Sequence, residues 1–186
     1  MKTLELARNR KTSRSFKKTD VSPDLIRTTI DVAREAPSGA NYQGWKFTVI
    51  TNQDTKKRIR EASEGGEKEF YGKVSGDWGQ WLNRSKINWM KPYLEEAPVL
   101  IAVFARNDVP YSKESVWLAV GYMLLALEEQ GLATVTYTPS SVKLVEDVLS
   151  VPEGYRLEVI LPIGYSNDAK SKEPRLGIEA VLETIS

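Results

Sequence analysis

Residues 36–50 read APSGANYQGWKFTVI, and they contain the end of a helix, a tight turn and the start of a strand. Proline, serine, glycine and asparagine between positions 37 and 41 favour a turn, and the alternation from Trp45 to Ile50 is typical of a β-strand. Upstream, Ser22 followed by Pro23 predicts a helix start, and that helix ends near Ala36. The order helix, turn, strand therefore opens the domain.

The hydrophobic pattern continues this alternation along the rest of the chain. It predicts a helix over 54–64, a buried strand over 99–104, a buried helix over 115–130 closed by a glycine, a strand over 133–137, a helix over 142–149 and a strand over 157–163. Strands that alternate with helices predict one α/β or α+β domain over residues 1–186.

The composition excludes several classes of enzyme. The 186 residues include no cysteine and no histidine, so disulfides, a thiolate nucleophile, Cys/His zinc sites, iron–sulfur clusters and Ser-His-Asp triads are absent. We predict no metal site and favour a cofactor that brings its own reactivity. Lysine and arginine number 26 against 25 aspartate and glutamate, so the net charge of +1 gives no general attraction to nucleic acid or to an acidic membrane.

The absence of a recognisable secretory signal or membrane span in the sequence favours the cytoplasm. Residues 1–11 are charged and lack an apolar stretch of the kind that a secretory signal needs. The longest apolar run, residues 116–127, is shorter than the roughly 18 residues that suggest a membrane span. We therefore expect a cytoplasmic protein with no membrane partner.

Two segments contain candidate functional residues. A basic arm over residues 8–18 carries six lysines and arginines with Thr12 and Ser13 among them, which suits a phosphate group, although a solvated arm or a nucleic-acid contact has the same composition. The second, over residues 65–91, is charged yet contains Trp78, Trp81 and Trp89. These residues predict either a lid over a binding site or a surface helical pair whose rings pack on the core.

The order of these pieces resembles the FMN-dependent nitroreductase superfamily, through the basic arm, residues 36–45 and the later Leu161-Pro162-Ile163-Gly164-Tyr165. Further motifs resemble the iodotyrosine deiodinase branch: Glu67-x-x-x-Tyr71, Asn88-Trp89-Met90-Lys91 and Thr134-Val135-Thr136-Tyr137-Thr138-Pro139. The resemblance implies a nitroreductase-like α+β fold, with a mixed central sheet flanked by helices. It also implies an intertwined homodimer whose C-terminal segments, from about Gly177, embrace the partner.

The resemblance further implies FMN-dependent reductive dehalogenation of halotyrosines, under a lid over residues 65–91. Glu67 would bind the substrate ammonium, Lys91 its carboxylate, Tyr71 the same amino-acid head, and the backbone N–H of Ala40 the phenolate. By residue type alone, a solvated surface pair is the favoured interpretation of Glu67 and Lys91.

The cofactor residues also follow from the resemblance. Thr138 matches the threonine that donates to flavin N5, which gives it a catalytic role; by residue type it could simply cap a turn. The full predicted FMN set is Arg10, Lys11, Thr12, Ser13, Arg14, Ser38, Gly39, Thr136, Tyr137, Thr138 and Arg175. Tyr137 stands where the family has a small hydroxyl residue.

Two rival functions remain open at this stage. A general NAD(P)H-dependent nitro or quinone reductase would share the FMN residues but would not need Glu67, Tyr71 or Lys91. A non-catalytic basic module, for example for RNA, would need only the basic arm. The sequence leaves the electron donor open between NAD(P)H and a partner reductase.

Overall fold

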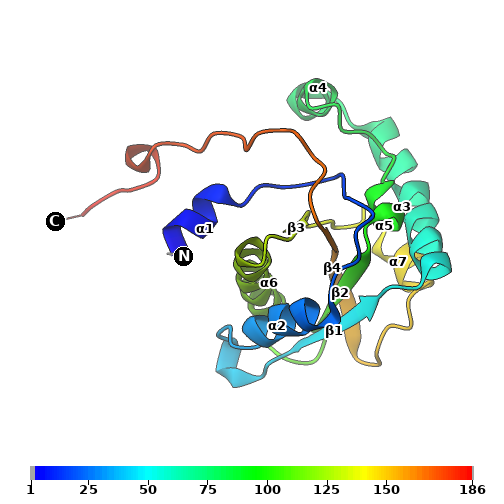
Figure 1. Ribbon diagram of the computed structural model, residues 1–186, viewed down its shortest axis with the longest axis horizontal. Helices are drawn as coiled ribbons and strands as arrows, with labels where there is room; N and C mark the ends of the chain where they lie inside the picture. Colours follow the sequence, from blue (N-terminus) through cyan, green and yellow to red (C-terminus); the bar gives the residue numbers. More distant parts are fainter. Residues whose placement is uncertain (1–2, 186) are drawn as a thin grey trace.

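The computed structural model describes residues 3–185, so Met1, Lys2 and Ser186, at the ends of the predicted domain, lie outside the described residues. Its centre is a four-stranded sheet of β1 (Trp45–Ile50), β2 (Val99–Arg106), β3 (Ala133–Thr134) and β4 (Tyr155–Gly164), in the order β1-β2-β4-β3 (Figure 1). All three strand pairs are antiparallel. A mixed sheet would need parallel pairs of strands as well. In the described residues the only parallel pairing is the isolated bridge between Thr12 and Thr134, so the four strands form an antiparallel sheet rather than the expected mixed one.

Helices cover both faces of this sheet, as the α+β prediction requires. The helices are α1 (Thr3–Asn9), α2 (Pro23–Ala33), α3 (Gln53–Lys73), α4 (Gly76–Arg84), α5 (Tyr93–Glu96), α6 (Ser112–Glu129) and α7 (Val142–Glu146), with short 3-10 turns at Gly39–Asn41 and Ile178–Ala180. In Figure 1, α2 and α6 lie on one side of the sheet and α3, α5 and α7 on the other. Among the described helices, none is long and apolar enough to cross a membrane.

Strand β2 explains why two helical layers form. Ile101 and Val103 pack with α2 and α6, whereas Leu100, Ala102 and Phe104 pack with α3, α5 and α7. Successive side chains of a strand point to opposite faces, so an uninterrupted apolar run can be buried on both. All five of these residues are fully buried.

Several predicted elements have different bounds in the structure. The helix predicted over 54–64 runs on to Lys73, and Asn52 caps its start by accepting a hydrogen bond from the Thr55 N–H at 2.9 Å. The strand predicted over 133–137 stops at Thr134. Tyr137 keeps only an isolated bridge to Ile160. The first third of the predicted lid, residues 65–73, is therefore the continuation of a helix that starts on the core.

The basic arm and the C-terminal tail lie side by side next to β3 and β4. The Ser13 N–H donates to the Thr134 carbonyl at 3.1 Å, and Phe16 forms a bridge with Ser166. The Lys11 ammonium donates to the carbonyls of Asp168 and Lys170, both at 2.7 Å. Beyond these contacts the tail runs away from the sheet (Figure 1). It is extended except for the short turn at Ile178–Ala180.

Two neighbouring glycines of α3 give opposite predictions for stability. A Cβ on Gly66 would lie 2.7 Å from the Ser141 Cβ, whereas a Cβ on Gly65 would meet nothing within 4 Å. We expect Gly66→Ala to lower the free energy of unfolding by about 1–3 kcal/mol through overpacking. Gly65→Ala should raise it by roughly 0.5–1 kcal/mol, because alanine favours the helix. Urea titration of both variants checks the pair, and equal effects would contradict the close approach at Gly66.

Candidate active site

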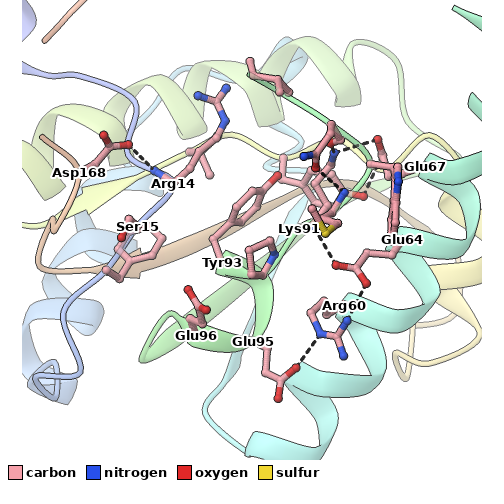
Figure 2. Close-up of a pocket in the computed structure, with 18 of the residues that line it drawn as sticks. Arg14, Ser15, Arg60, Glu64, Glu67, Lys91, Tyr93, Glu95, Glu96 and Asp168 are labelled. Carbon is pink, nitrogen blue, oxygen red and sulfur yellow. Dashed lines mark hydrogen bonds and ion pairs between the residues drawn. The ribbon is translucent and has the colours of Figure 1, made fainter. Parts of the chain in front are cut away.

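A cavity of about 1580 Å³ opens beside α3, between the basic arm, the lid segment (residues 65–91) and the tail. Trp78, Trp81 and Trp89 all line it, together with Arg14 from the arm and Asp168 from the tail. Figure 2 shows Arg14 and Lys91 on opposite walls, with Tyr93 between them. The tryptophans of the lid segment therefore form part of a cavity wall.

Glu67, Tyr71 and Lys91 meet in this wall. Glu67 and Tyr71 are one turn apart on α3, and the Lys91 Nζ lies 3.3 Å from the Glu67 Oε2 and 3.4 Å from the Tyr71 hydroxyl. Lys91 also donates to the Asn88 carbonyl. Glu67 and Lys91 are each only 5% exposed, so the interpretation as a solvated surface pair is wrong. Burial lowers the pKa of Lys91, and the neighbouring Glu67 opposes that shift.

The second oxygen of Glu67 faces the protein rather than the cavity. Glu67 Oε1 accepts hydrogen bonds from the Tyr137 hydroxyl at 3.0 Å and from the Ser140 N–H at 3.2 Å. The Tyr137 N–H and carbonyl both pair with Ile160. The sequence predicts Tyr137 as a contact of the cofactor, but the structure engages its hydroxyl and both main-chain groups within the chain.

Thr136 and Thr138 flank Tyr137, and their side chains lie on the opposite side of this extended segment from the Tyr137 ring. Both are exposed, both line the cavity, and neither hydroxyl has a hydrogen-bond partner among residues 3–185. Tyr137 between them is buried. Alternation along the extended chain thus turns the two threonines toward the cavity. Their predicted role as cofactor donors stays a prediction.

Three cations gather at the other end of the basic arm. Burial and the positive charge of Arg175 lower the pKa of Arg10, and burial, Arg175 and Arg10 together lower the pKa of Lys172, while the negative charge of Glu128 opposes both shifts. Mutual repulsion of this kind is relieved when an anion binds between the cations. The structure therefore brings the predicted Arg10 and Arg175 together, and it adds Lys172, which sequence reasoning missed.

Of the other predicted arm residues, Lys11, Thr12 and Ser13 contact the chain itself, whereas the Arg14 guanidinium bonds to none of the described residues. Ser13 is buried, with its hydroxyl bonded to the Ser15 carbonyl and near the Ser166 hydroxyl. Lys11 holds the tail, and Thr12 accepts from the Arg10 guanidinium at 3.4 Å. Arg14 uses its main-chain N–H to contact Asp168, while no partner within the described residues engages its guanidinium.

The turn over residues 38–41 does not line the cavity. Ala40 and Asn41 have left-handed backbone angles, with φ of 48° and 57°. Gly39 donates to the Ser115 hydroxyl, whereas within the described chain the Ala40 N–H has no partner. Figure 1 places this turn, next to α2, well away from α4. One chain alone therefore does not unite the turn with Glu67, Tyr71 and Lys91.

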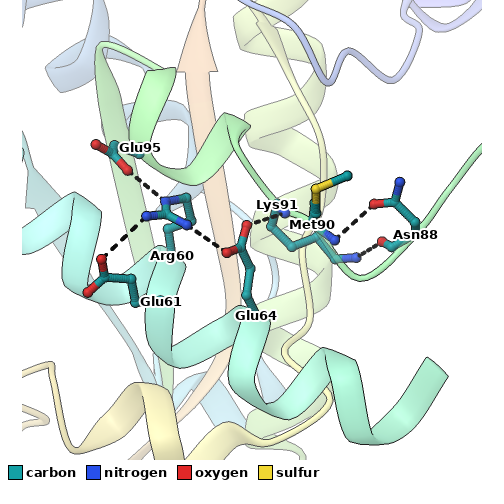
Figure 3. Close-up of polar contacts among 7 residues, drawn as sticks. All are labelled: Arg60, Glu61, Glu64, Asn88, Met90, Lys91 and Glu95. Carbon is teal, nitrogen blue, oxygen red and sulfur yellow. Dashed lines mark hydrogen bonds and ion pairs between the residues drawn. The ribbon is translucent and has the colours of Figure 1, made fainter. Parts of the chain in front are cut away.

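A polar clamp fixes the main chain at Lys91. Glu64 Oε1 accepts from the Lys91 N–H at 2.8 Å, and Arg60 holds the other Glu64 oxygen at 2.6 Å (Figure 3). Arg60 also bonds Glu95 at 2.6 Å. The sequence prediction missed Arg60, Glu64 and Glu95. Arg60 and Glu64 are four residues apart within the helix predicted over 54–64, so their shared face was the available signal.

No group of metal-ligating side chains occurs in the part of the chain that the structure describes.

The clamp predicts a stability difference between two helical ion pairs. Glu64→Gln weakens a pair whose side chains are 23% and 13% exposed, so we expect unfolding free energy to fall by about 1–2 kcal/mol. Glu69→Gln weakens a pair with Lys73 that is 74–75% exposed and should change stability little, because water screens it. Urea titrations at low and high salt measure both variants. Equal losses would show that the clamp contributes nothing beyond an ordinary surface pair.

Comparisons with known proteins identify the family. The model of the nitroreductase family matches residues 7–165. An iodotyrosine deiodinase of Thermotoga neapolitana is 49% identical over 176 residues, covering 94% of this chain and 95% of that protein. Iodotyrosine deiodinase 1 of Mus musculus is 35% identical over 97% of this chain and 68% of its own length.

A solved structure resembles the whole fold. It is the oxidized iodotyrosine deiodinase bound to FMN and 3-iodo-L-tyrosine, with a TM-score of 0.92 and 47% identity, over 95% of this chain and 96% of that one. Agreement in sequence and fold over nearly the full length shows that this chain belongs to the nitroreductase family, in the branch of the iodotyrosine deiodinases.

Proposed function

We propose that this chain is an FMN-dependent oxidoreductase that dehalogenates halotyrosines reductively, converting iodotyrosine into tyrosine and iodide. The observation that carries the proposal is the meeting of Glu67, Tyr71 and Lys91 at the cavity wall. A general nitro or quinone reductase has no use for a buried pair of opposite charges there. The deiodinase relatives and the bound 3-iodo-L-tyrosine of the matching structure support the same substrate class.

The charges of the wall complement an amino-acid zwitterion. The substrate ammonium would bind Glu67, and the carboxylate would bind Lys91, with the Tyr71 hydroxyl donating to the same head group. Glu67 would then replace part of its contact with the Lys91 ammonium by the substrate ammonium, and Lys91 would replace part of its contact with the Glu67 carboxylate by the substrate carboxylate. The halogenated ring carries no such charges, so it remains free to lie along the cavity.

A cationic group and two hydroxyl groups of the chain suit the binding of FMN. Arg10, Lys172 and Arg175 form a cationic group suited to the phosphate, and the open hydroxyls of Thr136 and Thr138 face the cavity. When bound, FMN supplies two electrons, which with one proton replace the carbon–halogen bond by a carbon–hydrogen bond and release halide. Among the chain's own residues, Thr138 would donate a hydrogen bond to the flavin, and the lid segment would exclude water.

The proposal includes a homodimer. The predicted phenolate donor, the Ala40 N–H, has no partner in the described chain, and its turn lies away from the lid segment of the same chain (Figure 1). A second copy would bring its turn to the cavity. The tail also leaves large apolar side chains in solvent, namely Leu176, Ile178, Val181, Leu182 and Ile185, at 59–93% exposure. These side chains would be buried if the tails exchange between two subunits.

The electrons would come from NAD(P)H or from a partner reductase, in the cytoplasm. The basic arm is engaged with the tail through Lys11 and Ser13, which supports a structural role for these two residues. A nucleic-acid partner forms no part of the proposal.

Ligand titration tests the substrate class directly. FMN-loaded protein is titrated with iodotyrosine and with iodophenol, which lacks the amino-acid head, while flavin fluorescence is followed. We expect tight quenching by iodotyrosine alone. Glu67→Gln should weaken iodotyrosine binding by about 10-fold to 100-fold, because a charge-assisted hydrogen bond is lost. The matched control is Glu69→Gln, on the same helix but 75% exposed, which should bind normally. Equal responses to both ligands would leave a general flavin reductase.

Sedimentation tests the homodimer. The full chain should sediment as a dimer at micromolar concentration. Removal of residues 177–186 should weaken both the dimer and FMN retention, because the exposed apolar tail would no longer be buried in a partner. A chain that is monomeric and still retains FMN would refute the shared site.

A further inference from the structure

The two oxygens of the Glu67 carboxylate have different surroundings. Oε1 receives two hydrogen bonds from the protein, from the Tyr137 hydroxyl and the Ser140 N–H. Oε2 lies 3.3 Å from the Lys91 Nζ on the cavity side. A carboxylate oxygen that already accepts two donors has little capacity left, so Oε2 is the oxygen available to a ligand.

The main chain and the ring of Tyr137 are held by residues outside the lid segment. Its N–H donates to the Ile160 carbonyl at 3.0 Å, and its carbonyl accepts from the Ile160 N–H at 2.8 Å, so β4 fixes its main chain. Its ring packs edge-on against Tyr93, with the ring centres 6.1 Å apart. Burial raises the pKa of Tyr137, so its hydroxyl stays protonated and can donate at neutral pH.

We propose that Tyr137 is a positioning residue of the amino-acid site: its hydroxyl fixes Glu67 through Oε1, so that Oε2 is presented to the ammonium group of the substrate. This inference rests on the proposed function. It assigns a role in specificity to a hydroxyl that acts through Glu67. A flexible glutamate would lose side-chain entropy when it binds an ammonium group, whereas a glutamate already held in place has that cost removed.

The same contact links two parts of the site. Tyr137 lies between Thr136 and Thr138, whose hydroxyls face the cavity, and it bonds to α3, which carries Glu67 and Tyr71. The helix that carries the amino-acid site is therefore fastened to the segment that would contact the flavin. Gly66 permits this approach, because α3 passes close to Ser141 there.

The experiment removes one hydroxyl. Tyr137→Phe holoenzyme is titrated with iodotyrosine and with iodophenol by flavin fluorescence, and its turnover is measured. We expect about tenfold weaker iodotyrosine binding, unchanged iodophenol binding, and a raised KM with kcat largely retained. The control Tyr155→Phe also removes a tyrosine hydroxyl beside the same apolar cluster, but Tyr155 does not line the cavity, so both ligands should bind it normally.

A double-mutant cycle separates positioning from packing. In the Glu67→Gln background, adding Tyr137→Phe should change iodotyrosine affinity by less than about twofold, because the carboxylate that Tyr137 orients is gone. Full additivity, or an equal loss of both ligands in Tyr137→Phe, would overturn the proposal. If the unmodified holoenzyme fails to distinguish iodotyrosine from iodophenol, the proposed function fails instead.

A crystal structure of the unmodified holoenzyme with iodotyrosine tests the geometry without any variant. The substrate nitrogen should lie within hydrogen-bond distance of Glu67 Oε2, with the Tyr137 hydroxyl still on Oε1. A substrate nitrogen on Oε1, or a Tyr137 hydroxyl turned away from Glu67, would contradict the proposal even if Tyr137→Phe did not fold.

Discussion

The buried pair of Glu67 and Lys91 is the interaction on which the cavity wall depends. Taking two charges out of water costs several kcal/mol per ion, and their mutual attraction repays this only when the remaining donors and acceptors are also satisfied. Tyr137 and Ser140 complete Glu67, and Tyr71 and the Asn88 carbonyl contact Lys91. Segments that are distant in the sequence must therefore converge on one point of α3.

The sheet makes this convergence possible. β2 is buried on both faces, so it supports α3 and α5 on one side while α2 and α6 close the other. β4 pairs with β2 and also fixes Tyr137 through Ile160. The charged pair, itself part of the lid segment, is consequently fastened to a rigid core through Tyr137. Rigid support of this kind allows a site to be preorganised.

The distribution of functional residues within one chain explains why a second copy belongs in the proposal. The turn with the open Ala40 N–H lies next to α2, and the lid segment lies beyond the other face of the sheet. The apolar tail leaves its own domain without covering either. In a monomer the Ala40 N–H has no partner among the described residues and the apolar tail stays exposed to water, whereas both would gain partners in the proposed intertwined dimer.

The sequence by itself determined the features that depend on near neighbours. The Ser22 cap, the β1 strand and the apolar run of β2 follow from local patterns. The basic arm with residues 36–45 and 161–165 indicated the family, and the motifs around Glu67 and Thr138 indicated its branch. Residue types left Glu67 and Lys91 as a surface pair, and the family resemblance gave Ser13 to the cofactor. Only the tertiary structure decided that the pair is buried, that Ser13 bonds to the tail, and that the Tyr137 hydroxyl turns to Glu67. The reason is physical: periodicity and capping act within a few residues, whereas burial depends on which distant segments fill the same volume.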